Sequence, residues 1–297
     1  MTDTNLISSR RRAARFLAAA TMTSALALAG CASTPAASAK NDADKPAATS
    51  APAPKTLSDS AILDAATSAD KTQDFIAAAA YWGQLYDRKQ DDAETAVNYS
   101  KALRQIGSAA QALTVMQRTQ TLKPDDVNVM VEYGKVLAAS GHPDQAQPVL
   151  ARAAALKPGD WTVLSAEGVS LDQLGRFAEA QDKYNAALKI VPSNPSVLTN
   201  LGLSYALEGK LDDAERTLRL AVADPRAGAT ARQNLAIVLG LKGNFDEASR
   251  LARADLPQTV ADNNIAYLKE MLTQPASWKQ METLDGQPAG APAPQTP

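Results

Sequence analysis

The sequence has little of the chemistry that most enzymes and nucleic-acid-binding proteins need. One cysteine and one histidine in 297 residues leave no internal disulfide, no Cys-X-X-Cys motif and no histidine cluster for a metal. The 30 basic and 32 acidic side chains give no positive excess to neutralise a phosphate backbone. No glycine-rich phosphate loop or serine elbow is present either. We therefore expect a protein that is not an enzyme, with no metal, cofactor, small-molecule substrate or nucleic-acid partner.

The first thirty residues have the layout of a secretory signal peptide. A cluster of arginines from Arg10 to Arg15 precedes an uncharged stretch from Phe16 to Ala29. That stretch ends in Leu28-Ala29-Gly30-Cys31, which resembles the bacterial lipobox, where the cysteine thiol carries a diacylglycerol. The sequence therefore predicts a signal peptide over residues 1–30 and lipidation at Cys31. Ser9-Arg10-Arg11 hints at a twin-arginine signal, but the following residues do not continue that pattern, so both export routes stay open.

The residue after the cysteine bears on where such a lipoprotein resides. In lipoproteins of double-membrane bacteria an aspartate at this place favours the inner membrane, and here the residue is Ala32. The resemblance thus implies the outer membrane, with the protein facing the periplasm. Residues 31–57 are rich in Ala, Pro, Ser and Thr, which predicts a disordered tether, and residues 275–297 are expected to be a disordered tail.

The middle of the chain repeats every 34 residues. Glycines recur at this spacing as Gly107, Gly141, Gly175, Gly209 and Gly243. An alanine follows each glycine by five residues, a small residue precedes it by seven (Ser100, Gly134, Gly168, Gly202 and Ala236), and three of the repeats share a proline. Such a period predicts a stack of identical supersecondary units.

Each unit is interpreted as a hairpin of two antiparallel helices. The recurring glycine supplies the positive φ that ends the first helix. The small residue before it lets the second helix approach closely, the alanine after it faces that contact, and proline ends the second helix. The pattern resembles the tetratricopeptide repeat, and Asn200-Leu201-Gly202-Leu203-Ser204-Tyr205 lies close to its consensus.

The expected fold is therefore all-α: a tetratricopeptide-repeat solenoid of antiparallel helix hairpins with a C-terminal capping helix. The predicted segments are a degenerate repeat over 58–92, full repeats over 93–126, 127–160, 161–194, 195–228 and 229–258, and a capping helix over 259–274. Asn264-Ile265-Ala266 echoes Asn234-Leu235-Ala236 at a spacing of 30, and Ile265, Leu268 and Leu272 are the expected buried stripe of the cap. Asp255 departs from the pattern, which usually has a small packing residue there.

The resemblance also implies a binding groove. Tetratricopeptide stacks commonly bind ligands with the second, fifth, ninth, twelfth and thirteenth places of each first helix. Transferring these places to this sequence gives a groove that changes from basic to apolar. The candidate partner-binding residues are Lys101, Arg104, Lys135, Leu203, Leu207, Ile237 and Leu241. A solvated helix face is the alternative for the basic residues, and burial within the stack is the alternative for the apolar ones.

A narrower resemblance concerns the whole architecture. The lipobox, the tether, five repeats and the closing segments Leu251–Leu256 and Asn264–Leu268 resemble the TadD family of Flp/Tad (tight adherence) pilus assembly lipoproteins. This resemblance implies a non-catalytic scaffold that binds a secretin or other pilus assembly components. A general repeat lipoprotein serving cell-wall synthesis or outer-membrane protein assembly is the alternative. Whether the groove is occupied by the chain itself, and the oligomeric state, stay open.

Overall fold

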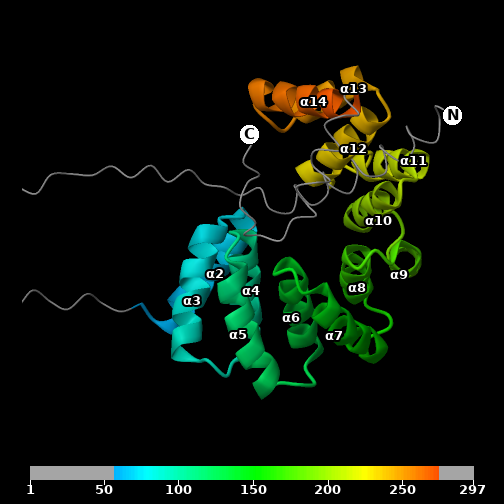
Figure 1. Cartoon of the computed structure of the whole chain (residues 1–297). Helices are drawn as coiled ribbons and strands as arrows, with labels where there is room; N and C mark the ends of the chain where they lie inside the picture. The colour runs from blue at the N-terminus through cyan, green and yellow to red at the C-terminus, as the bar shows by residue number, and fades with distance from the viewer. Residues whose placement is uncertain (1–56, 274–297) are drawn as a thin grey trace, which may run out of the picture. The chain divides into compact units, whose positions relative to one another are not determined.

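The computed structural model describes residues 57–273. This part of the chain consists of thirteen α-helices joined by short loops, with no strand, and consecutive helices pair as hairpins (Figure 1). The predicted all-α repeat fold is confirmed. The predicted signal peptide, the lipidation site at Cys31, the tether up to residue 56 and the tail over 275–297 lie outside the described residues.

The chain divides after Leu122 into two compact units, each described here by itself. The N-terminal unit contains α2 (Asp59–Thr72), α3 (Phe75–Arg88), α4 (Ala93–Gln105) and α5 (Ala109–Leu122). The C-terminal unit contains α6 (Val127–Ala139), α7 (Pro143–Leu156), α8 (Trp161–Gln173), α9 (Phe177–Ile190), α10 (Pro195–Glu208), α11 (Leu211–Val222), α12 (Ala229–Leu241), α13 (Phe245–Arg253) and α14 (Gln258–Thr273).

The first helix of each hairpin starts at a capping side chain that recurs with the repeat. Asp92, Asp126, Asp160 and Asn194 each precede a first helix and accept hydrogen bonds from backbone N–H groups of its first turn. These bonds satisfy donors that have no partner within the helix. The helices α4, α6, α8 and α10 therefore begin where the 34-residue spacing places the repeat starts.

The glycine that follows each first helix has a positive φ, as the sequence predicts. The φ angles of Gly107, Gly141, Gly175, Gly209 and Gly243 lie between 73° and 89°. In this conformation the chain reverses, so the residue after Gly141 donates its N–H to the carbonyl of Leu137 at 2.9 Å. A side chain would strain this backbone conformation, which is why glycine recurs there.

The small residues in the first helices permit the close approach of the second helices. A Cβ added at Gly134 would lie 2.5 Å from Leu150, and one at Gly202 would lie 2.6 Å from Leu218. The alanines on the facing second helices are fully buried, namely Ala112, Ala146, Ala180, Ala214 and Ala248. The predicted roles of both series are thus confirmed, and the core of each hairpin is built around them.

The capping helix α14 closes the C-terminal unit with a slightly different stripe from the one predicted. Ile265 and Leu268 are buried as expected, but Met271 is buried more deeply than Leu272, which only packs partly against the same cluster. Leu268 packs against Gly240 of α12, where an added Cβ would lie 2.3 Å from its Cδ2 atom. The cap is therefore seated directly on the last repeat.

Asp255, the departure from the repeat pattern, forms an ion pair inside the fifth repeat. Its two carboxylate oxygens accept hydrogen bonds from Arg232 Nε at 2.8 Å and Nη2 at 2.5 Å. Arg232 lies on α12, and Asp255 lies in the loop between α13 and α14. The pair joins the last hairpin to the segment that leads into the cap.

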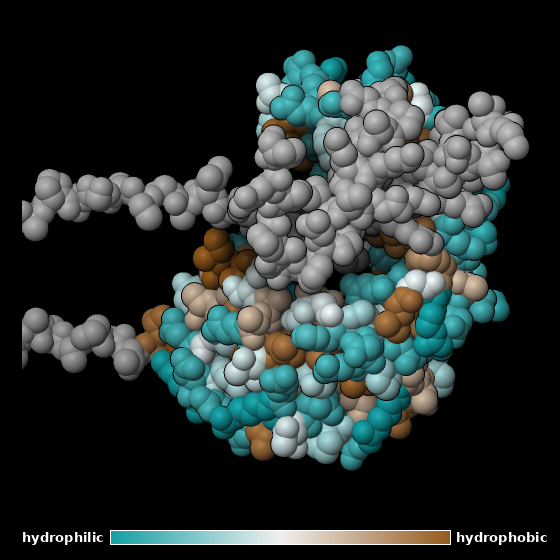
Figure 2. Space-filling view, viewed as in Figure 1, coloured by the Kyte–Doolittle hydropathy of each residue, from teal (hydrophilic) through white to brown (hydrophobic). Residues whose placement is uncertain are grey.

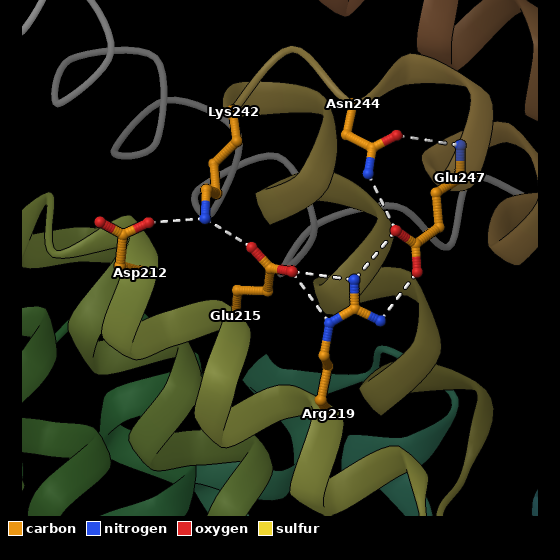
Figure 3. Close-up of polar contacts among 6 residues, drawn as sticks. All are labelled: Asp212, Glu215, Arg219, Lys242, Asn244 and Glu247. Atoms are coloured by element: carbon orange, nitrogen blue, oxygen red, sulfur yellow. Dashed lines mark hydrogen bonds and ion pairs between the residues drawn. The ribbon is translucent and has the colours of Figure 1, made fainter.

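A network of charged side chains connects the fourth and fifth repeats (Figure 3). Lys242 Nζ contacts Asp212 Oδ1 at 2.6 Å and Glu215 Oε2 at 2.5 Å. Arg219 contacts Glu215 at 2.8 Å and makes a bidentate pair with Glu247 at 2.8 and 2.9 Å. Hydrogen bonds from Lys242 and Arg219 hold the pKa of Glu215 below its usual value, against the opposing effect of burial. The network holds α11 against the hairpin that follows it.

Candidate binding face

The residues predicted to bind a partner are divided between the two units. Lys101 and Arg104 lie on α4 of the N-terminal unit, where Lys101 is exposed and its Nζ donates to Asn98 Oδ1 at 3.3 Å. Lys135 lies on α6 of the C-terminal unit and is half-buried. The basic and apolar parts of the predicted groove are therefore described as separate surfaces.

In the C-terminal unit the first helices α6, α8, α10 and α12 pack against one another in order. We call the second, fifth, ninth, twelfth and thirteenth places of α8, α10 and α12 the first-helix face. Its ninth places carry Val169, Leu203 and Ile237, all half-buried, and Leu207 at a thirteenth place is also half-buried. The face thus has an apolar row whose side chains are partly open to solvent.

Leu241 does not belong to an open groove, which corrects the sequence-based prediction. Its side chain is fully buried against Leu268 and Met271 of the capping helix. Ile237 packs partly against the same cluster. The alternative of burial within the stack therefore holds for Leu241, because α14 lies over that end of α12.

The N-terminal halves of the same helices carry a row of small polar side chains. This row consists of Thr162, Ser165, Ser196, Thr199, Thr230 and Gln233. Thr199 Oγ1 donates to the carbonyl of Pro195 at 2.6 Å, and Ser165 Oγ accepts from Asn200 Nδ2 at 3.1 Å. Among the places of the first-helix face, the one formally charged residue is Asp172 at the twelfth place of α8, and α10 and α12 carry only apolar and neutral polar groups there.

This carboxyl group lies at the junction between the third and fourth repeats. Asp172 at the end of α8 accepts hydrogen bonds from Ser204 Oγ of α10 at 2.6 Å and from Tyr184 Oη of α9 at 2.9 Å. Burial, with a smaller contribution from the nearby Glu208, raises the pKa of Asp172 to about 7, although the hydrogen bonds from Ser204 and Tyr184 lower it. Glu208 itself contacts Gln181 at 2.7 Å and Lys210 at 2.9 Å.

Two candidate residues on α14 are absent from the sequence-based set. The 30-residue echo places Tyr267 opposite Ile237 and Val260 opposite Thr230 in the repeat pattern. Tyr267 is 55% exposed and Val260 is 43% exposed. The 34-residue spacing ends at the fifth repeat, so it does not reach α14. The spacing of 30 that relates the cap to α12 is the sequence signal for both residues.

The described residues offer no other type of site. Between residues 57 and 273, no three His, Cys, Asp or Glu side chains come together in a way that could hold a metal ion. In the same range, no helix combines the length and the apolar character needed to cross a membrane. On the surface seen in Figure 2, hydrophilic residues predominate and hydrophobic residues occur in small separate patches.

Several solved structures are similar to this chain. A thermophilic TPR protein in Thermus thermophilus, TTC0263, is 20% identical with a TM-score of 0.54, covering 62% of this chain and 100% of that chain. MamA AMB-1 is 27% identical with a TM-score of 0.44, covering 54% of this chain and 95% of that chain. MamA 41-end from Desulfovibrio magneticus RS-1 is 17% identical with a TM-score of 0.45, covering 56% of this chain and 97% of that chain. No curated protein gives a significant match.

Family comparison gives the same assignment directly from the sequence. One tetratricopeptide repeat model matches residues 63–127 and 133–195, and a second matches residues 195–219. Together these ranges extend over just over half of the chain. The matches agree with the hairpins, the positive-φ glycines and the close helix contacts described above. The chain therefore belongs to the tetratricopeptide-repeat family.

Proposed function

We propose that this protein is a lipid-anchored scaffold that binds a protein segment on the first-helix face of its C-terminal unit. The observation that carries the proposal is the row of half-buried Val169, Leu203, Leu207 and Ile237 beside neutral polar side chains. Partly open apolar rows on a folded domain are typical of contact surfaces. Tetratricopeptide-repeat proteins are typically non-catalytic scaffolds, and we expect this chain to have no catalytic activity.

The finer proposal is a role in a Tad/Flp-type pilus secretion machine, in which the scaffold assists assembly or localisation of the secretin. The resemblance of the lipobox, tether and closing segments to the TadD family supports it. Scaffolding of cell-wall synthesis or of outer-membrane protein assembly is the second candidate, supported by the same repeat architecture. The two differ in the partner, so purification of the protein from its native membrane, followed by identification of the bound proteins, separates them.

The membrane anchor depends on Cys31, which we propose is lipidated and holds the protein at the outer membrane, facing the periplasm. Two or more acyl chains hold a protein stably at a membrane, whereas a single chain does so only weakly. Metabolic labelling with a fatty-acid analogue should mark the wild-type protein and not Cys31→Ser, and the variant should leave the membrane fraction. Equal labelling of the two proteins would contradict the anchor.

The partner-binding role predicts a specific effect of a charge in the apolar row. Leu207→Asp places a carboxylate where an apolar partner side chain would pack, so co-purification of the secretin and pilus assembly should be lost. Leu207 is only half-buried, so the helical circular dichroism signal and the cellular level should persist. The matched control is Leu220→Asp, because Leu220 on α11 is 60% exposed and lies on a second helix. Equal co-purification with both variants would reject this face as the binding site.

A further inference from the structure

The capping helix α14 follows the last repeat and packs on its first helix, α12. It packs on α12 through Leu268, which fills the space above Gly240, and through Met271, which covers Leu241. In the repeat pattern α14 takes the place of a next first helix, with a spacing of 30 instead of 34. Tyr267 then stands at the ninth place, the same place as Val169, Leu203 and Ile237 in the preceding helices.

The Tyr267 side chain is not part of the buried side of α14 that seals the stack. Ile265, Leu268 and Met271 form the buried side of α14, and each is at most 9% exposed. Tyr267 leaves 55% of its surface open, and Val260, two helical turns earlier, leaves 43% open. A large ring of this kind offers apolar area at a low cost in conformational entropy, which is why tyrosine is frequent among the residues that dominate binding energy.

Three charged residues of α12 and α14 contact α13 or the loop that follows it. Asp262 of α14 pairs with Arg253 of α13 at 2.7 Å, and Lys269 Nζ lies 5.7 Å from the ring centroid of Phe245. Arg232 of α12 pairs with Asp255. These contacts direct the charges towards α13 and its loops. The places that make up the first-helix face on α10 and α12 carry neutral residues only. Glu270, which is exposed one helical turn after Tyr267, is the charged residue that α14 adds at the equivalent places.

We propose that Tyr267 anchors a partner segment that is uncharged and carries aliphatic side chains, seated on the first-helix face from α10 to α14. The proposal rests on the proposed function as a protein-binding scaffold and specifies the residue and the partner chemistry. The aliphatic side chains pack on Leu203, Leu207 and the Tyr267 ring, while neutral polar groups of the segment meet the small polar side chains of α10 and α12. A charged side chain of the segment would lose hydration against α10 and α12 without gaining an ion pair there.

The chain's own C-terminal residues fit this chemistry poorly. Residues 274–285 contain Trp278, Met281 and Leu284 but also Lys279, Glu282 and Asp285, which would have no counter-charge on the face at α10 and α12. Residues 286–297 are uncharged but contain no Leu, Ile, Val or aromatic residue. A separate protein segment therefore meets both requirements better than either part of the tail.

The test selects ligands without assuming any particular partner. A phage-displayed library of random peptides of about 12 residues, long enough for a helix or strand in a groove, is panned against the full chain carrying Cys31→Ser. We expect selected peptides with net charge near zero and at least two aliphatic residues. Their affinity, measured by fluorescence anisotropy, should change less than about twofold between ~50 mM and ~500 mM NaCl, because no ion pair is formed.

Substitutions then locate the binding site. Tyr267→Ala should weaken binding of the selected peptides by about tenfold or more, as for an aromatic anchor, whereas Tyr267→Phe should retain most of the affinity because the ring remains. Leu220→Ala removes an equally exposed apolar side chain from α11 and should have no effect. Unchanged thermal unfolding of Tyr267→Ala will show that the loss concerns binding and not folding.

Several outcomes would overturn the inference. These are peptides that are acidic or basic with strong salt dependence, equal binding by Tyr267→Ala and wild type, or no selected peptide at all. Binding that appears only when Trp278, Met281 and Leu284 are replaced by Ser would identify the chain's own segment as the occupant and also reject the proposal. Because the library contains no pilus component, failure of the pilus role leaves this test unaffected, and the reverse also holds.

Discussion

Gly168→Val should lower the free energy of unfolding by about 3 kcal/mol, the upper part of the range for overpacked cores. A Cβ at Gly168 would lie 2.6 Å from Cε1 and 2.8 Å from Cζ of the Tyr184 ring. Tyr184 is only 1% exposed, and its hydroxyl donates to Asp172, so the ring has no space to move into. Urea unfolding of the full chain carrying Cys31→Ser, followed by circular dichroism, measures the change.

The matched control for this prediction is Gly159→Val. Gly159 lies in the loop between α7 and α8, has no heavy atom within 4 Å of an added Cβ, and does not have a positive φ. The same substitution there should leave the urea midpoint almost unchanged. If Gly168→Val and Gly159→Val have the same urea midpoint, the close approach of α8 and α9 does not limit the stability of the C-terminal unit.

Asp172→Asn should stabilise the protein more at pH 8 than at pH 5. The pKa of Asp172 is about 7 in the folded protein against an ordinary 3.8, so between these values the folded state binds more protons than the unfolded state. Stability contributed by this group therefore falls as the pH rises through that window. The full effect is on the order of 2–4 kcal/mol. Asparagine does not ionise, and its amide oxygen can still accept a hydrogen bond, so the variant avoids this loss.

The measurement compares, at two pH values, the difference in unfolding free energy between the variant and the wild type. The titration of all other groups is common to both proteins and cancels. Urea unfolding of wild type and Asp172→Asn is compared at about pH 5 and about pH 8, and the gain of the variant should be larger at the higher pH. Asp182→Asn is the control, because Asp182 is exposed on the neighbouring helix α9. A gain that is the same at both pH values would show that Asp172 ionises in the folded state as it does in the unfolded chain.

The features that set this chain apart from a plain repeat stack are departures from the 34-residue pattern. Asp255 replaces a small packing residue and pairs with Arg232. Asp172 occupies a place that is Ala138 and Ala206 in the neighbouring repeats, and it joins three helices through Tyr184 and Ser204. The shorter spacing to α14 gives the exposed Tyr267 the ninth place of the repeat pattern. Function in repeat proteins is expected in such departures, because the regular positions are needed for packing.

The sequence by itself determined the hairpins and their register. Gly141 and its equivalents act locally, since a positive φ depends only on the residue and its immediate neighbours. Gly168 and its equivalents act across one hairpin, where the second helix follows within a few residues of the first. Both kinds of constraint are visible as residue types at a fixed spacing, so the fold could be predicted from the sequence.

The tertiary structure alone decided which residues of the first-helix face are available. Leu241 has the same residue type and repeat place as Leu207, yet α14 buries it completely while Leu207 stays half-buried. The raised pKa of Asp172 likewise comes mainly from its burial within the stack and outweighs the hydrogen bonds that Tyr184 of α9 and Ser204 of α10 donate to it. Equal places in a repeat become unequal when their neighbours differ. Exposure and charge state are set by contacts between helices distant in sequence, and the spacing of residues along the chain does not specify those contacts.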